Sequence, residues 1–73
     1  MSVPKIGDLY PDGVRIVVDW DAMEVGMSVF VPCVNTAEAT KQLKKVSKTR
    51  GWTTQVQVRI EDGRFGVRMW RIL

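Results

Sequence analysis

The stretch that decides the fold is QVQVRIEDGRFGVRMW, residues 55–70. Its centre, Asp62-Gly63, is the preferred pair for a two-residue type I′ turn, and the runs on both sides alternate apolar and polar residues. This turn sets a register in which the apolar residues meet on one face, in the pairs Ile60–Phe65, Val58–Val67 and Val56–Met69. Because turn chemistry and alternation give the same register independently, we predict a hairpin whose apolar face lies on the core.

A helix is predicted before the hairpin, over about residues 36–50. Asn35 and Glu38 have the spacing of a capping box, and Gly51 stands where a left-handed C-terminal cap is expected. At about 100° per residue, three apolar residues share one stripe: Ala39, Leu43 and Val46. The helix is expected to bury this stripe against the sheet.

Two further strands are predicted before the helix. Residues 14–20 are rich in β-branched side chains and bounded by turn residues, and the strand over residues 27–31 is stopped by Pro32. The predicted order is β-β-α-β-β, an α+β fold with one helix packed on a small antiparallel sheet. We expect residues 1–13 to form an irregular N-terminal arm and residues 14–73 to form a single domain.

The composition restricts the chemistry that this chain can perform. Its 73 residues include no His and one cysteine, Cys33. The commonest general base and metal ligand is therefore missing, and a lone cysteine forms neither an intrachain disulfide nor a thiolate cluster. Asp19, Asp21 and Glu24 match no known cation-binding loop. We expect a protein that is not an enzyme and that uses no cofactor and no metal.

The apolar residues give no sign of a membrane or export segment. No apolar run approaches the ~18 residues that a bilayer-spanning helix needs. Residues 1–5 lack the apolar core and the cleavage site of a signal peptide. We therefore expect no membrane partner and a cytoplasmic location.

Charge is divided unevenly along the chain, although the net charge is only +3. Residues 1–38 carry two basic side chains against six acidic ones, whereas residues 39–73 carry nine against two. Such segregation favours a nucleic acid or an acidic protein surface as the partner. The alternative is that the acidic front half folds against the basic back half, within one chain or across a homodimer.

The first candidate binding surface is a stripe of lysines in the predicted helix. Their spacing of i, i+3, i+4 and i+7 places them on the face opposite the apolar stripe: Lys41, Lys44, Lys45 and Lys48. Like charges at these spacings cost roughly a few tenths of a kcal/mol per pair. A surface of this kind can hold phosphates and bind with a steep salt dependence. The alternative is a solvated helix face.

The second candidate surface is the polar face of the hairpin. It is formed by Gln55, Gln57, Arg59, Arg68 and Trp70. Arg and Gln side chains can read base edges, and a Trp ring can stack on a base. The alternative is that the N-terminal arm or a dimer partner covers Trp70.

For four other residues we expect structural rather than functional roles. Arg71 falls on the core side near Thr54, where we expect an acidic partner from the front half of the chain. Trp20 and Trp52 are expected in the core or an interface. Cys33 precedes the predicted helix, where a thiolate would be stabilised, but without His we expect a half-buried small residue rather than a nucleophile.

Three pieces of the sequence together resemble a family of small bacteriophage proteins. They are residues 23–32, MEVGMSVFVP, the Lys-rich helix, and residues 66–72, GVRMWRI. The family pattern runs V-G-x-S-F-F-V-P, a basic helix, then G-V-R-V-W-R. This chain departs from it at Val29 and Met69, and the resemblance covers about residues 23–72. The resemblance implies a viral origin and the host cytoplasm, and it implies no particular activity.

The leading hypothesis is a phage-type nucleic-acid-binding domain, with DNA favoured. The four helix lysines would hold phosphates, and Arg59, Arg68 and Trp70 would contact or stack on bases. If the helix packs on the apolar face of the sheet, however, the two surfaces point in opposite directions. The alternative is a protein–protein interaction module, host-directed or self-assembling, in which Trp70 and Ile72 anchor an interface.

Overall fold

The computed structural model describes residues 8–73, and the chain folds around a β-hairpin. Strands β2 (Thr54–Glu61) and β3 (Arg64–Arg71) pair antiparallel in the predicted register, including Val58 opposite Val67. Asp62 and Gly63 both have positive φ angles, 51° and 74°. A type I′ turn requires this conformation at both central residues. The turn therefore fixes which side chains of the hairpin share a face.

Strand β1 (Ser28–Pro32) completes a three-stranded sheet in the order β1-β3-β2. It runs antiparallel to β3, with Val29 opposite Met69 and Val31 opposite Val67. Pro32 closes β1, which is an edge strand, where a missing N–H is tolerated. The predicted strand over residues 27–31 is thus confirmed, shifted by one residue.

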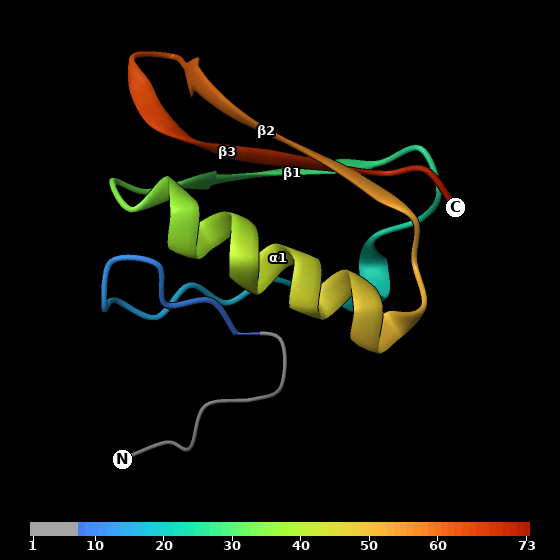
Figure 1. Ribbon diagram of the computed structural model, residues 1–73. Coiled ribbons are helices and arrows are strands. Elements are labelled where there is room, and N and C mark those ends of the chain that lie inside the picture. The colour runs from blue at the N-terminus through green and yellow to red at the C-terminus, as the bar shows by residue number, and fades with distance from the viewer. Residues whose placement is uncertain (1–7) are drawn as a thin grey trace.

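Helix α1 (Thr36–Arg50) has the predicted bounds and the predicted caps. The Asn35 side-chain oxygen accepts the Glu38 backbone N–H at 3.1 Å, and Gly51 adopts the left-handed conformation with φ of 70°. The helix lies across one face of the sheet (Figure 1). Its apolar stripe is buried, with Leu43 fully inaccessible. None of the helices in residues 8–73 has the length and apolar character needed to cross a bilayer.

The core lies between α1 and the sheet. Its buried apolar residues come from α1, β1, β3 and the segments outside the sheet and α1: Leu9, Trp20, Met23, Val31, Cys33, Ala39, Leu43, Val46, Val67 and Met69. The sheet supplies Val31, Val67 and Met69, each at most 1% exposed. An α+β fold with one helix on an antiparallel sheet is therefore confirmed.

The segment predicted as the first strand, residues 14–20, does not join the sheet. It makes a single bridge, Leu9 to Ile16, and then enters the short 3-10 helix η1 (Trp20–Ala22). Strand propensity measures how well a residue fits a half-buried pleated surface, and here Val14 and Val17 face solvent. The prediction of a fourth strand is wrong because no neighbouring strand extends the bridge.

Residues 8–19 instead pack along α1 (Figure 1). The Tyr10 backbone N–H donates to the Gln42 side-chain oxygen at 2.7 Å. The Asp12 carboxylate accepts the backbone N–H groups of Val34 and Asn35 at 2.9 and 2.8 Å. Residues 1–7 of the expected arm lie outside the described residues.

The apolar face of the hairpin is covered only in part, which corrects the prediction that all six residues face the core. Val67 and Met69 are buried, and Val56 packs against the core. Near the turn, however, Val58, Ile60 and Phe65 are 53%, 72% and 47% exposed. The hairpin end curves away from α1 in Figure 1, so the helix leaves it uncovered.

Candidate nucleic-acid interface

Helix α1 carries the four lysines on its solvent side. All four are exposed, whereas Ala39, Leu43 and Val46 on the other side of the helix are buried. The predicted division of the helix into an apolar and a basic face is therefore present. We call Lys41, Lys44, Lys45 and Lys48 the lysine face.

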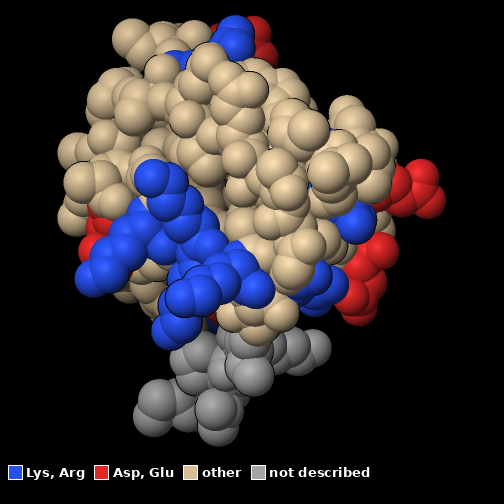
Figure 2. All heavy atoms as spheres, turned by 45° about the vertical axis from the view of Figure 1, so that its right-hand side comes forward, with Lys and Arg blue, Asp and Glu red and all other residues tan. Residues whose placement is uncertain are grey.

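The ammonium groups of the lysine face have no carboxylate partner within residues 8–73. The ion pairs formed there use Arg15, Arg50, Arg59 and Arg68. One of them, Arg50 to Asp21 at 2.8 Å, joins the basic half of the chain to the acidic half. The alternative was that acidic residues of the front half neutralise the basic back half. Such an ion pair forms at the end of α1, but the lysine face stays unpaired within residues 8–73. Figure 2 shows one large group of Lys and Arg side chains on this view of the molecule, with smaller basic groups at the top and on the right.

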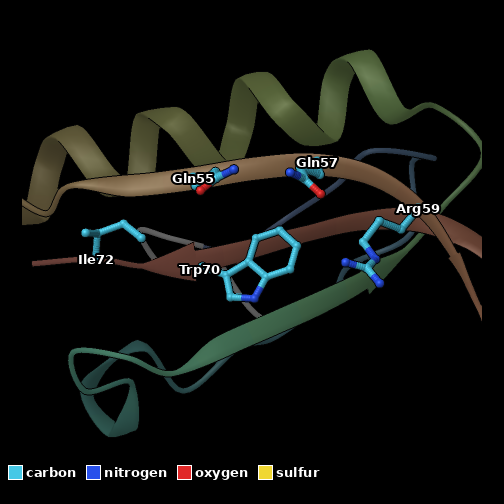
Figure 3. A pocket seen from close by; sticks show the side chains of 5 residues that line it. All are labelled: Gln55, Gln57, Arg59, Trp70 and Ile72. Atoms are coloured by element: carbon cyan, nitrogen blue, oxygen red, sulfur yellow. The ribbon is translucent and has the colours of Figure 1, made fainter.

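The polar side of the hairpin forms the face of the sheet away from α1, which we call the outer face. Trp70 projects from β3 between side chains of β2 (Figure 3). An open hollow of about 370 Å³ lies here, lined by Gln55, Gln57, Arg59, Trp70 and Ile72. Trp70 is half-buried, and the Arg59 guanidinium carbon lies 5.5 Å from its ring centroid. The lysine face and the outer face therefore lie on opposite sides of the molecule.

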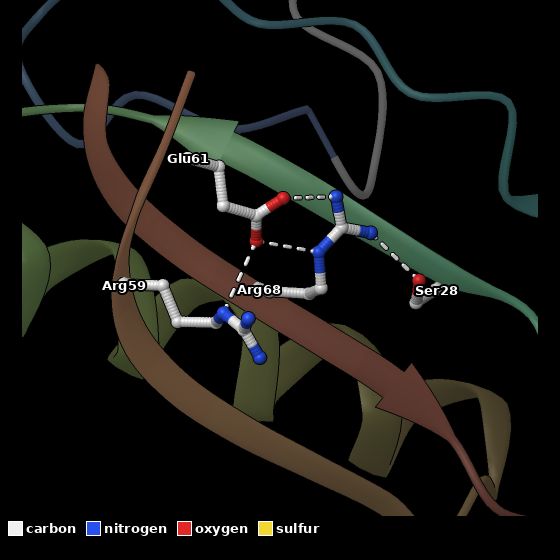
Figure 4. A network of polar contacts seen from close by, with 4 residues as sticks. All are labelled: Ser28, Arg59, Glu61 and Arg68. Carbon is white, nitrogen blue, oxygen red and sulfur yellow. Dashed lines mark hydrogen bonds and ion pairs between the residues drawn. The ribbon is translucent and has the colours of Figure 1, made fainter. Parts of the chain in front are cut away.

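The two arginines of the outer face are engaged by Glu61 (Figure 4). Arg68 donates from Nε and Nη2 to the two carboxylate oxygens at 2.7 and 2.6 Å, and from Nη1 to the Ser28 hydroxyl at 2.7 Å. Arg59 Nε lies 3.4 Å from the same carboxylate. A bidentate pair of this kind is among the stronger charged hydrogen bonds. Base reading by Arg68 would require this network to open.

The network also sets the protonation of its members. The hydrogen bond from Arg68 lowers the pKa of Glu61, and the charges of Arg68 and Arg59 act in the same direction. The same hydrogen bond raises the pKa of Arg68. Glu61 therefore remains an anion at any physiological pH, and it neutralises part of the outer face.

The lowered pKa predicts an acid-sensitive contribution to stability. A carboxylate with a depressed pKa stabilises the fold above its ordinary value of 4.5 and loses that contribution as the pH falls through the lowered value. Glu61→Gln should therefore lower the thermal midpoint at about pH 7, with a difference from wild type that shrinks towards about pH 3. Glu24→Gln makes the same change at an exposed position outside the network; it is the control and should leave the midpoint close to that of the wild type at both pH values. An unchanged difference at all pH values would contradict the role of the ion pair.

Within residues 8–73, Arg71 forms no ion pair with an acidic side chain. It faces Thr54 in the register, as predicted. Its Nη1 donates to the Met23 carbonyl oxygen at 2.7 Å, and its guanidinium carbon lies 4.2 Å from the Trp52 ring centroid. The prediction of an ion pair is wrong because a backbone carbonyl and an aromatic ring satisfy the guanidinium instead.

The other residues that the sequence singled out, Trp20, Trp52 and Cys33, pack in or against the core. Trp20 is buried and meets Trp52 edge-on, with ring centroids 6.3 Å apart. Cys33 is buried, and burial followed by the charge of Asp12 raises the pKa of its thiol, so the helix start does not produce a thiolate there. No cluster of potential metal-ligating side chains occurs in the described part of the chain.

Sequence reasoning missed Glu61 and Ser28 as partners of Arg68. In the register Arg68 faces Gln57 and Phe30, and Glu61 faces Arg64. Glu61 and Arg68 do share the outer face, which is the one signal in the sequence that could have indicated a contact. Along β3, Arg68 lies four residues from Arg64, and Gly66 between them has no side chain to separate Arg68 from Glu61.

Comparison of the chain with protein-family models, with curated proteins and with solved structures finds no match. The two candidate surfaces differ in their charge. The lysine face carries charge that is unpaired within residues 8–73, and the outer face carries charge that is largely satisfied within the chain.

Proposed function

We propose that this protein binds nucleic acid, with DNA favoured, through the lysine face of α1. The observation that carries the proposal is that four exposed ammonium groups share one helix face and form no ion pair within residues 8–73. A partner with closely spaced negative charges would satisfy them together. The protein acts as a binding domain rather than as an enzyme.

The dimensions of the lysine face fit a phosphate backbone. Seven residues separate Lys41 from Lys48, which corresponds to about 10 Å along the helix axis. Phosphates of one DNA strand follow one another every ~3.4 Å of duplex axis. The lysine face can therefore contact several successive phosphates of one strand.

Binding also relieves a strain within the helix. Neighbouring lysines three and four residues apart repel one another by roughly a few tenths of a kcal/mol per pair. An anion placed against them replaces this repulsion with attraction. The repulsion destabilises the free protein but not the complex, so its removal favours binding.

The proposed binding is independent of base sequence. Lysines at phosphates position a protein but do not distinguish bases. Arg68, which could read a guanine, is held by Glu61 and Ser28. We expect duplexes of different sequence to bind with similar affinity.

The test is the salt dependence of binding to a labelled duplex, measured by fluorescence anisotropy. Four phosphate contacts give a slope of log affinity against log salt of about −3.6. Each single change of Lys41, Lys44, Lys45 or Lys48 to Gln should reduce the slope by about one. Changing all four to Glu should abolish binding.

Arg64→Gln is the matched control for these variants. It removes the same charge from an exposed position at the hairpin end, away from α1, and should leave the slope unchanged. If Arg64→Gln and the lysine variants had equal effects, binding would depend on the net charge of the protein and not on the lysine face. Absence of binding at low salt would overturn it. Loss of binding on Trp70→Ala with the lysine variants unaffected would instead favour the outer face.

A further inference from the structure

Strand β2 forms a free edge of the sheet. The strand order is β1-β3-β2, and within residues 8–73 no strand pairs with the other side of β2. β2 is eight residues long, from Thr54 to Glu61. An edge strand presents unpaired backbone N–H and C=O groups, which can pair with another strand.

The backbone hydrogen bonds of β3 show which residues of β2 present these groups. Arg71 donates its N–H to Met27 and accepts from Gly26, so its backbone points to the β1 side. The carbonyl of Phe65 also points to that side, where it accepts from Cys33. Backbone direction alternates along a strand, so even-numbered residues of β3 face β2 and bond its odd-numbered residues. The free edge is therefore formed by the even-numbered residues of β2: Thr54, Val56, Val58 and Ile60.

The two edges of the sheet differ in their protection. β1 has five residues and ends in Pro32, which is a common device against unwanted pairing. β2 contains no Pro, Gly or Lys. Its charged residues, Arg59 and Glu61, pair with each other on the outer face at 3.4 Å. The β2 edge is thus long, apolar and unprotected.

We propose that β2 pairs antiparallel with β2 of a second copy of this chain, about a two-fold axis at Gln57. In this register Val56 faces Val58 of the second copy, and Ile60 faces Thr54. Val58 and Ile60, which are 53% and 72% exposed in the single chain, gain a neighbour on the apolar face. The interface is self-complementary, as a two-fold contact requires.

The charges of β2 favour this register over the one with the axis at Arg59. With the axis at Gln57, Arg59 faces the amide of Gln55 of the second copy, and like charges do not meet. A shift that places the axis at Arg59 sets the two copies of Arg59 directly opposite each other, which is destabilising. The Gln57 register also pairs residues 54–60 in full.

The symmetry has a consequence for α1. Antiparallel pairing of two edge strands in one sheet requires the two-fold axis to stand perpendicular to the sheet, so both helices lie on the same side of a six-stranded sheet. The two lysine faces then point in the same direction. The use of both lysine faces on one nucleic acid rests on the proposed function, whereas the pairing of the β2 strands does not.

The oligomeric state, measured by light scattering without nucleic acid, tests the pairing. The wild type should have about twice the 8.3 kDa mass of one chain. Val58→Lys places two ammonium groups near the axis and should halve the mass. Val34→Lys is the control, because Val34 is 81% exposed and lies outside β2; it should leave the mass doubled. A monomeric wild type, or a dimer that Val58→Lys leaves intact, would overturn the proposal.

A cysteine pair tests the register. Odd-numbered residues are non-hydrogen-bonded across the proposed interface, where opposed Cα atoms are ~4.5 Å apart, within disulfide range. Gln57→Cys should therefore form an interchain disulfide under mild oxidation. Gln55→Cys, on the same face of the same strand, lies too far from its symmetry mate and should not. Both variants retain buried Cys33, which controls for its reactivity. Cross-linking of Gln55→Cys alone would overturn the proposed register.

Discussion

Leu43→Ala is expected to remove about 3 kcal/mol from the free energy of unfolding. Leu43 is fully inaccessible and lies at the centre of the stripe that α1 packs on the sheet. Its loss leaves a cavity that the hairpin and β1 cannot fill without losing their pairing. A chain of this size has a total stability of only about 4–11 kcal/mol. The substitution should therefore lower the thermal midpoint by roughly 12–24 °C.

Thr49→Ala is the matched control for Leu43→Ala. Thr49 lies on the same helix, is exposed, and bonds only the Lys45 carbonyl one turn earlier. Replacing it by Ala should change the free energy of unfolding by less than about 0.5 kcal/mol. Thermal and urea unfolding followed by circular dichroism give both values. Similar midpoints for the two variants would mean that α1 is not packed on the sheet as described.

Gly66→Ala is expected to destabilise the protein by a similar amount, about 3 kcal/mol, through overpacking. Gly66 sits in the central strand, opposite Pro32 of β1 and Arg59 of β2. An added Cβ would collide with the Val31 carbonyl oxygen and lie 2.8 Å from Phe30 Cζ. The ring can rotate away, but the carbonyl oxygen belongs to the backbone of β1. The variant should therefore loosen β1 and increase amide hydrogen exchange along it.

The double variant Gly66→Ala/Phe30→Ala separates the collision with the ring from the collisions with the backbone of Val31 and Pro32. It removes the ring and keeps the backbone contact, so we expect only partial recovery of the thermal midpoint. Full recovery would place the whole cost on the ring and contradict the expected opening of β1.

The parts of the fold that local chemistry determines could be predicted from the sequence. Asn35 and Gly51 fixed both ends of α1 because each satisfies backbone groups within a few residues of itself. Asp62-Gly63 fixed the register of the hairpin for the same reason. Val14 and Val17 had equally good strand propensity, but a strand also needs a partner with a free edge, and local sequence does not supply one.

The extent of the core could not be predicted from alternation alone. Alternation assigns Val58, Ile60 and Phe65 to the apolar face correctly, but burial depends on what covers that face. The 15 residues of α1 span about 22 Å, whereas eight strand residues span about 26 Å. The sheet also twists, so its far end leaves the helix.

The candidate site also has one part that local sequence predicts and one part that it does not. The lysine face follows from spacing on one helix, so the sequence predicted its geometry. The state of Arg68 did not follow, because Glu61 faces Arg64, four residues from Arg68 along β3, so the two are not cross-strand neighbours. The phage resemblance and the choice of nucleic acid stay predictions.

Burial of Cys33 makes its alkylation a probe of local opening in the folded chain. Its thiol is shielded and its pKa is raised, and it is the thiolate that attacks an alkylating reagent. Labelling therefore awaits opening of the segment between β1 and α1. At reagent concentrations where alkylation outpaces reclosing, the rate at which a maleimide or iodoacetamide consumes this sulfur equals the rate of opening, with no engineered reporter.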